Sequence, residues 1–324
     1  MSASVQLSVG VRNFANAPPT DWRHLLDQAR AADDAGIDRI FVNDHVVFGS
    51  DLSAYGNPRL GGRVGGVQPT GPDGDWLEPL TVLAAMAAVT SRVRLATNVL
   101  VAPIRPPVLL AKTATTLDVL SHGRFELGVG IGWQEAEFRA LGIDFAKRGQ
   151  VLDELLAACR ELWTTTEARL VTDRFSLAGV HMMPKPTAAG GVPVWIGGSP
   201  ITGVARRLAR YGAGWIPWGA TPENFPELLE RMRDLVAAQG RDFSTVQVCY
   251  AIPTILSRQR RLDFDAMFEP VPKLMAQGVA DFRMMPRLPV GYPAARELLE
   301  QLGQAFRSVI GPGGQPDDAR TEVR

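Results

Sequence analysis

Short apolar runs alternate along the chain with longer segments of helical periodicity. The apolar runs predict β-strands, and the longer segments carry apolar residues at the spacing of amphipathic helices. The predicted strands are residues 5–11, 37–44, 93–101, 124–132, 193–198, 213–218, 245–252 and 280–285. The predicted helices are residues 20–36, 77–90, 106–120, 149–163, 201–210, 222–239, 264–277 and 293–309, and Thr20 is the expected cap of the first helix.

This alternation predicts an α/β protein with a parallel sheet, because parallel strands need helical crossovers between them. Eight strand–helix pairs favour closure into a (β/α)8 TIM barrel over an open doubly wound sheet. We therefore expect one barrel domain over residues 1–312 and a flexible polar tail over residues 313–324.

Two segments depart from the alternation. Residues 49–75 follow the second predicted strand, are rich in glycine and proline, and are too long for a simple connection. Residues 166–191 follow the fourth strand–helix unit and predict a small hairpin. We expect both insertions to lie over the active site as lids.

The composition excludes several classes of protein. Lys and Arg number 34 and Asp and Glu number 34, so the chain has no overall charge that would attract nucleic acid or an anionic membrane. No apolar stretch approaches a membrane span of about 18 residues, and the N-terminus lacks the pattern of a signal peptide, which predicts a cytoplasmic protein. The spacing of Cys159 and Cys249 predicts buried thiols, and four scattered histidines argue against a metal-dependent hydrolase.

In TIM barrels the reactive groups lie at the carboxyl ends of the strands. His45 is the only histidine that directly follows a predicted strand, and its imidazole suits a general acid or base, or an electrostatic partner for a reduced cofactor. Asp44 beside it is a candidate to orient the ring or to contact a cofactor. A surface histidine and a loop cap are the alternative interpretations of the two residues.

The third and fourth predicted strands carry unusual residues near their ends. Asn98 is polar within an apolar run and needs a hydrogen-bond partner. Gly128, Gly130 and Gly132 indicate either that some group approaches the backbone closely or that the barrel packs there against a helix. Their spacing is not a dinucleotide-binding fingerprint, since no acidic strand end follows about 20 residues later.

The fifth predicted strand ends in a turn that leads directly into a helix. Its residues are Gly197, Gly198 and Ser199. Backbone N–H groups and a hydroxyl at the start of a helix suit a phosphate group, while a simple strand–helix turn is the alternative.

Over about residues 5–310 the chain resembles the luciferase-like monooxygenase superfamily, and most closely its branch of F420-dependent oxidoreductases. The resemblance is carried by FVNDHVV (residues 41–47), by the long block of residues 76–149, and by PVWIGGSP with the segment that follows it (residues 193–218). The long block is specific for the superfamily, but FMN and F420 members share much of it.

The resemblance implies that F420, or FMN as the alternative, binds in the mouth of the barrel. It also implies a non-prolyl cis peptide at Asn98-Val99 and matches Asp44 and His45 to the Asp-His pair of the family. The implied residues around the cofactor phosphate are Gly130, Ile131, Gly132, Trp133, Gly197, Gly198 and Ser199.

One departure from the family pattern bears on the substrate. Sugar-phosphate dehydrogenases of this branch carry a glutamate just after the fourth-strand glycines, where this chain has Trp133, and Glu135 is out of register. A sugar-phosphate substrate is therefore not expected. The tryptophans Trp76, Trp133, Trp215 and Trp218 instead suggest an apolar substrate cavity, with core packing as the alternative.

These features predict an enzyme that transfers a hydride between F420 and an organic substrate, without a metal. The alternatives are an FMN-dependent two-component monooxygenase supplied by a separate reductase, and a non-catalytic protein that only binds the cofactor. The resemblance further suggests a homodimer formed through helices on one flank.

Overall fold

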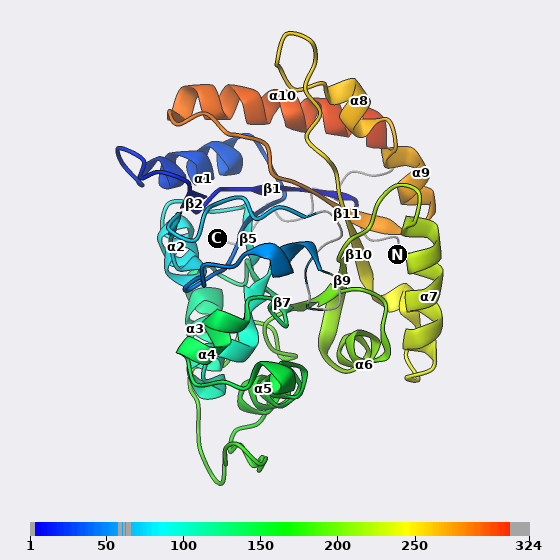
Figure 1. Ribbon diagram of the computed structural model, residues 1–324. Coiled ribbons are helices and arrows are strands. Elements are labelled where there is room, and N and C mark those ends of the chain that lie inside the picture. Colours follow the sequence, from blue (N-terminus) through cyan, green and yellow to red (C-terminus); the bar gives the residue numbers. More distant parts are fainter. Residues whose placement is uncertain (1–3, 58–59, 61, 63–65, 312–324) are drawn as a thin grey trace, which may run out of the picture.

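A closed ring of parallel strands forms the centre of the computed structural model, which describes residues 4–57, 60, 62 and 66–311 (Figure 1). Every strand of the ring pairs in parallel with its neighbours. The fold is therefore the predicted (β/α)8 barrel. Its strands are β1 (Gln6–Gly10), β3 (Arg39–Val42), β5 (Arg94–Thr97), β7 (Phe125–Gly130), β8 (Val194–Gly198), β9 (Gly212–Pro217), β10 (Gln247–Ala251) and β11 (Val279–Met284).

Helices surround the ring, and the main hydrophobic core lies between them and the strands. The first and last helices, α1 and α10, pack side by side along one edge (Figure 1). The helices are α1 (His24–Asp34), α2 (Pro79–Ala87), α3 (Pro107–Leu120), α4 (Glu135–Ala140), α5 (Arg148–Thr164), α6 (Thr202–Tyr211), α7 (Phe225–Ala237), α8 (Phe264–Phe268), α9 (Val271–Ala276) and α10 (Tyr292–Ile310).

Some element boundaries differ from those that the sequence predicts. Helix α1 begins only at His24, and no side chain caps it, so the expected cap at Thr20 was wrong. The predicted helix over residues 264–277 is divided into α8 and α9, because Pro270 and Pro272 lack the N–H groups that a continuous helix needs. Helix α4 was not predicted.

The predicted third strand is interrupted by a bulge. Strand β5 ends at Thr97, the Asn98-Val99 peptide is cis as the resemblance implied, and β6 (Leu100–Val101) then pairs with β7. The Val99 side chain packs inside the barrel against Trp195, Ile216 and Cys249.

Glycines of the neighbouring strands make room for this bulge. A Cβ atom at Gly130 or Gly197 would lie 2.7 or 3.0 Å from the Val99 side chain, and one at Gly128 would overlap the carbonyl oxygen of Thr97. The expected close approach to the fourth strand is thus confirmed, and the approaching group is the chain's own third strand.

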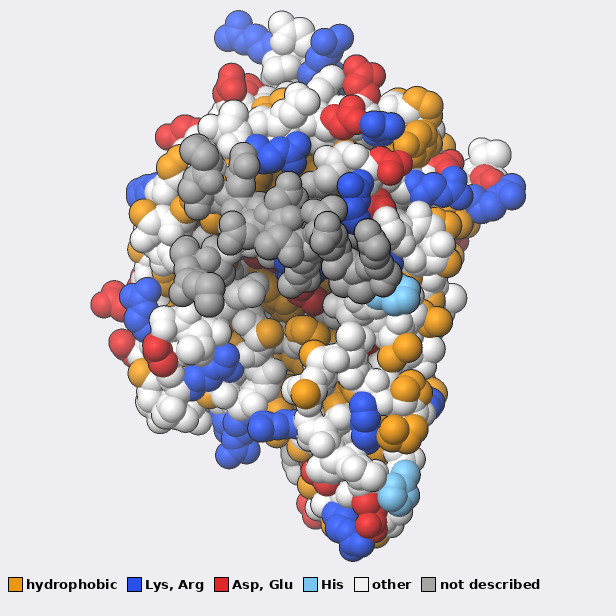
Figure 2. Space-filling view, turned by 180° about the vertical axis from the view of Figure 1, so that it is seen from behind, with side chains coloured by type: hydrophobic (Ala, Val, Ile, Leu, Met, Phe, Trp, Pro, Cys, Tyr) orange, Lys and Arg blue, Asp and Glu red, His pale blue; other side chains and the backbone are white. Residues whose placement is uncertain are grey.

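The two insertions have different structures. Segment 49–75 contains the 3₁₀ helix η1 (Ser53–Gly56), and its end, β4 (Asp75–Trp76), pairs antiparallel with β2 (Phe14–Ala15). The predicted hairpin within residues 166–191 is present, with the bridges Ala168–Val180 and Val171–Ser176. It projects from the body of the molecule with charged side chains of both signs (Figure 2).

The predicted tail over residues 313–324 lies outside the described residues. Both cysteines are buried, as expected, and burial raises the pKa of each thiol to about 12. Within the described part of the chain, none of the helices has the length and apolar character that a membrane crossing requires.

We expect Gly128→Ala to lower the free energy of unfolding by about 1–3 kcal/mol. The added methyl group would overlap the Thr97 carbonyl, which is backbone and cannot turn aside. Denaturation midpoints measure the effect, and Gly190→Ala is the matched control because nothing lies within 4 Å of a Cβ atom there. Equal stability of the two variants would contradict this packing.

Candidate functional site

The carboxyl ends of β3, β5, β7 and β8 meet at one rim, which we call the mouth of the barrel. The Asn98 N–H donates to the Val42 carbonyl at 2.8 Å, which joins the ends of β5 and β3. Val99 lies against Gly130 and Gly197, and the Trp133 indole reaches His45. The structure therefore brings the predicted site residues together.

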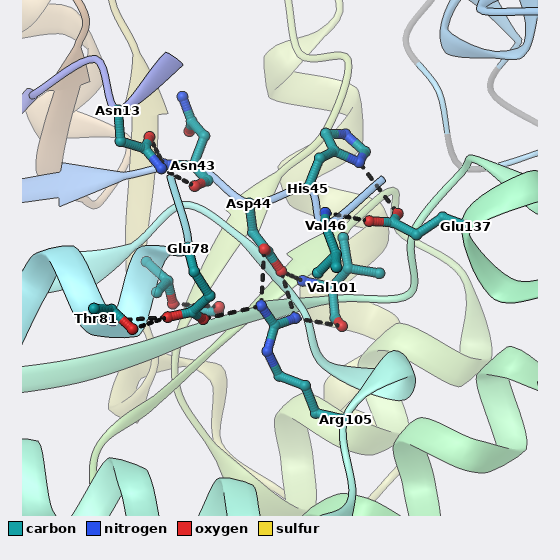
Figure 3. A network of polar contacts seen from close by, with 12 residues as sticks. Asn13, Asn43, Asp44, His45, Val46, Glu78, Thr81, Val101, Arg105 and Glu137 are labelled. Carbon is teal, nitrogen blue, oxygen red and sulfur yellow. Dashed lines mark hydrogen bonds and ion pairs between the residues drawn. The ribbon is translucent and has the colours of Figure 1, made fainter. Parts of the chain in front are cut away.

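His45 is held between two side chains. Its Nδ1 lies 3.2 Å from Glu137 Oε2 (Figure 3). Its Nε2 lies 3.1 Å from Trp133 Nε1. An indole N–H can only donate, so Nε2 accepts and Nδ1 carries the proton that is donated to Glu137. The second Glu137 oxygen accepts the Val46 N–H at 2.6 Å, and the carboxylate is fully buried. These contacts fix both the ring orientation and the tautomer of His45.

Asp44 points away from His45, toward Arg105 (Figure 3). Its two oxygens lie 2.6 and 2.8 Å from the guanidinium, and one of them also accepts the Val101 N–H at 2.8 Å. The expectation that Asp44 orients the imidazole was therefore wrong, because Glu137 makes that contact. Asp44 instead anchors the chain just beyond the bulge.

The Asp44–Arg105 pair is almost completely enclosed. Burial raises the pKa of Asp44, although Arg105 opposes this shift. Burial would lower the pKa of Arg105, but Asp44 and Glu78 outweigh burial and raise it. Glu78 lies 3.2 Å from the guanidinium and also accepts from the N–H and hydroxyl of Thr81 at the start of α2.

Aromatic rings surround His45. The ring centroids of Phe48, Trp76 and Trp133 lie 4.5, 5.2 and 5.3 Å from the imidazole. These three residues with Phe14, Tyr55 and Trp218 form what we call the aromatic cluster.

Trp215 does not belong to the aromatic cluster. It is fully buried in the main core and donates to the Gly198 carbonyl at 2.9 Å. The suggestion that it lines a substrate cavity was therefore wrong. Trp218, in contrast, lies at the mouth, where its indole donates to the Gly62 carbonyl of the first insertion at 2.7 Å.

The turn after β8 lies at the same rim. The Gly198 carbonyl accepts from the Trp218 N–H, and the Ser199 hydroxyl donates to the Trp218 carbonyl at 3.4 Å. Helix α6 begins at Thr202, so its first backbone N–H groups follow this turn.

Arg148 at the start of α5 lies close to the fourth-strand end. Its guanidinium donates to the carbonyls of Gly132, Phe145 and Leu60 at 3.2, 2.8 and 3.3 Å. None of the ion pairs among the described residues includes it. Partial burial lowers the pKa of Arg148.

Charged side chains fill the barrel below the mouth. We call Arg39, Arg94, Glu126, Asp281 and Arg283 the ionic cluster, in which the ion pairs are 2.6–2.9 Å long. Burial would raise the pKa of Asp281, but Arg39 and Arg283 outweigh it and lower that pKa. Arg283 Nη1 donates to Asn98 Oδ1 at 2.9 Å, so the polar partner that Asn98 needs is Arg283.

Several of these residues were missed in the sequence. Glu137 lies four positions after Trp133 and two positions after Glu135, the glutamate that is out of register with the family pattern. Asp281 and Arg283 alternate with apolar residues in β11, and charges at inward-facing strand positions were the available signal. Arg105 lies in a connection and Arg148 is the first residue of α5, and neither carries a local pattern.

No group of three or more potential metal ligands from His, Cys, Asp and Glu occurs among residues 4–57, 60, 62 and 66–311.

Comparison with known proteins places these features in a family. The model of the luciferase-like monooxygenase family matches residues 1–267. An uncharacterised protein of Mycobacterium tuberculosis is 38% identical over 168 residues, which are 51% of this chain and 58% of that protein. The pyrimidine monooxygenase RutA of Rhizobium rhizogenes is 30% identical over 217 residues, which are 63% of this chain and 59% of that enzyme. The chain thus spans little more than half the length of these relatives.

Solved structures share the architecture. An F420-dependent secondary alcohol dehydrogenase in complex with an F420-acetone adduct superposes with a TM-score of 0.71 at 17% identity, covering 94% of this chain and 99% of that one. At this identity the likeness shows the fold alone.

Proposed function

Because the chain belongs to the luciferase-like monooxygenase family, we propose that it is an oxidoreductase that acts on an organic substrate with F420 bound at the mouth of the barrel. The observation that carries the proposal is the meeting of the His45–Glu137 pair with the Asn98-Val99 bulge at one rim. When bound, F420 would exchange a hydride with the substrate, while the protein supplies position and electrostatics.

The residues at the mouth fit such a cofactor. Val99 offers an apolar surface beside the polar Asn98, as a flat ring with polar edges requires. The turn before α6 offers backbone N–H groups to a phosphate, and Arg148 adds a guanidinium that forms no ion pair among the described residues. We assign the ring and phosphate contacts to Asn98, Val99, Gly130, Ile131, Gly132, Trp133, Gly197, Gly198 and Ser199.

His45 is the catalytic residue in this proposal. Its Nε2 lone pair would accept the proton of a substrate hydroxyl, or the protonated ring would return a proton to a substrate oxygen. To reach Nε2, the substrate oxygen must replace the Trp133 N–H that now occupies it. Glu137 is a positioning residue that holds Nδ1, and Asp44 acts through Val101 and Arg105.

The aromatic cluster indicates the kind of substrate. Around His45 the described rings offer apolar faces and indole N–H groups, and the nearby Glu137 is already engaged with His45 and Val46. A charged substrate would lose its hydration here without gaining a partner. We therefore propose an uncharged, largely apolar alcohol or carbonyl compound.

The second candidate is an FMN-dependent two-component monooxygenase. It is favoured by the similarity to a pyrimidine monooxygenase, and a separate reductase would then supply the reduced flavin. FMN has a similar ring and a phosphate, so the same residues would hold it. A non-catalytic cofactor-binding protein is less well supported, because the orientation of His45 by Glu137 would serve no purpose there.

The purified chain is expected to bind F420 with a lower dissociation constant than FMN. Separate titrations of the two cofactors, followed by fluorescence, measure this preference. Binding of FMN alone, with oxygen consumption in the presence of a reductase, would support the monooxygenase instead. Binding of neither would contradict the proposed function.

We expect His45→Ala to bind the cofactor as the parent does and to lose about 10²–10⁴-fold in turnover. Steady-state kinetics with the cofactor-loaded enzyme measure the loss, and His181→Ala in the projecting hairpin is the control because that histidine is exposed. Near-full turnover of His45→Ala would exclude His45 from the chemistry.

We also propose the homodimer that the resemblance suggested, formed through α3. The side chains of Val108, Leu109, Val119 and Leu120 in α3 are exposed, and hydrophobic side chains gather at that edge of the molecule (Figure 2).

Light scattering should give a molar mass of twice 35.1 kDa for the parent chain. The double variant Leu109→Glu with Leu120→Glu should have the mass of the monomer. Val171→Glu, at an exposed position in the hairpin, should change nothing. A monomeric parent would refute the dimer.

A further inference from the structure

The ionic cluster carries more positive than negative charge. Three guanidinium groups share two carboxylates, since Glu126 pairs with Arg39 and Arg94 and Asp281 pairs with Arg39 and Arg283. The side chains of Arg39 and Asp281 are fully buried and that of Arg283 is 2% exposed, so little water screens them. Outside the cluster, Asp38 acts electrostatically on Arg94 and Arg39, and Arg94 is partly exposed, so the charge that bears on the mouth is the local one of Arg283.

Arg283 also keeps an unused donor. Its Nε donates to Asp281, its Nη1 donates to Asn98, and its guanidinium lies 4.5 Å from the Trp195 ring centroid. Its Nη2 is buried without a hydrogen-bond partner among the described residues, and the same is true of Arg39 Nε. Buried donors on cations are normally paired, because leaving them unpaired is costly. The unpaired donor of Arg283 therefore indicates that this residue has a role other than stabilising the fold.

Arg283 lies next to the proposed ring site. Arg283 contacts Asn98, which forms the bulge together with Val99. An FMN ring that takes up two electrons and one proton gains one negative charge above neutral pH. A positive charge close to that part of the ring favours the reduced form.

We propose that the ionic cluster, with Arg283 as its nearest member, stabilises the reduced, negatively charged form of the bound ring over the oxidised form. The proposal rests on the proposed function only in requiring that a flavin-type ring binds at the bulge. Arg283 is a positioning residue here, because it acts by its charge and through Asn98.

The test compares the affinities of the two redox forms. Dissociation constants of oxidised and dithionite-reduced FMN are measured anaerobically at pH 8 with the full chain. Arg283→Met should reduce the preference for the reduced form by about tenfold, because it removes the nearest positive charge. For a two-electron couple this corresponds to a fall of about 30 mV in the midpoint potential of the bound cofactor.

Asp281→Asn provides the opposite change. It removes a negative charge from the same buried cluster and should increase the preference for the reduced form by a similar factor. The double variant should return close to the parent. Structural damage would weaken the binding of both forms and would not give shifts of opposite sign.

Control variants separate charge from folding. Arg23→Met removes an exposed arginine and should leave the ratio unchanged. If Arg283→Met does not fold, Arg94→Gln removes charge from the more exposed end of the cluster and should give a smaller shift in the same direction. Asp281→Asn tests the proposal independently.

The outcomes distinguish this inference from the proposed function. A parent chain that binds neither ring refutes the proposed function itself. If the parent binds a ring, the ratio of the two dissociation constants decides the role of the ionic cluster. A ratio that is unchanged in both variants, or that shifts in the same direction in Arg283→Met and Asp281→Asn, refutes only that role.

Discussion

The fully buried ion pairs of Arg39 join distant parts of the barrel. They connect β3 to Glu126 of β7 and to Asp281 of β11, while hydrogen bonds to Ser8 and Gln6 reach β1. Removing one partner of a buried pair typically costs 3–5 kcal/mol, because the other charge is left without compensation. Here each carboxylate lies between two guanidinium groups, so neither depends on one partner. Because Arg283 of the same cluster holds Asn98, the closure of the ring and the shape of the mouth depend on one set of contacts.

Asp44 and His45, which follow β3, make contacts on different sides of the chain. In an extended chain adjacent side chains point in opposite directions, and Asp44 and His45 follow this rule. Asp44 reaches Val101 and Arg105 and holds the chain beyond the bulge, whereas His45 faces the aromatic cluster. Adjacency in the sequence had suggested that the carboxylate orients the imidazole. The structure assigns that contact to Glu137, which is 92 residues away.

This contrast explains which features the sequence could predict. The eight strand–helix units were predictable because each depends on local periodicity, and the glycines at Gly128 and Gly130 marked a close approach before the approaching group was known. The cis peptide at Asn98-Val99 came only from the family resemblance. The partners of His45 and Asn98 lie 92 and 185 residues away, and no local pattern identifies them. The division of α8 from α9 is different, because Pro270 and Pro272 mark it in the sequence itself.

The charges around the mouth are unevenly distributed. Near His45, Asp44 and Glu78 share Arg105 and Glu137 contacts the imidazole, whereas the ionic cluster beneath Asn98 has more arginines than carboxylates. This arrangement suits a reaction in which a proton is held at one edge of the site and negative charge develops at the other, because each is stabilised where it forms. FMN and F420 would both benefit from it, since both rings can accept a hydride. The choice between them must therefore depend on side chains that contact the remainder of the cofactor, beyond the bulge and His45.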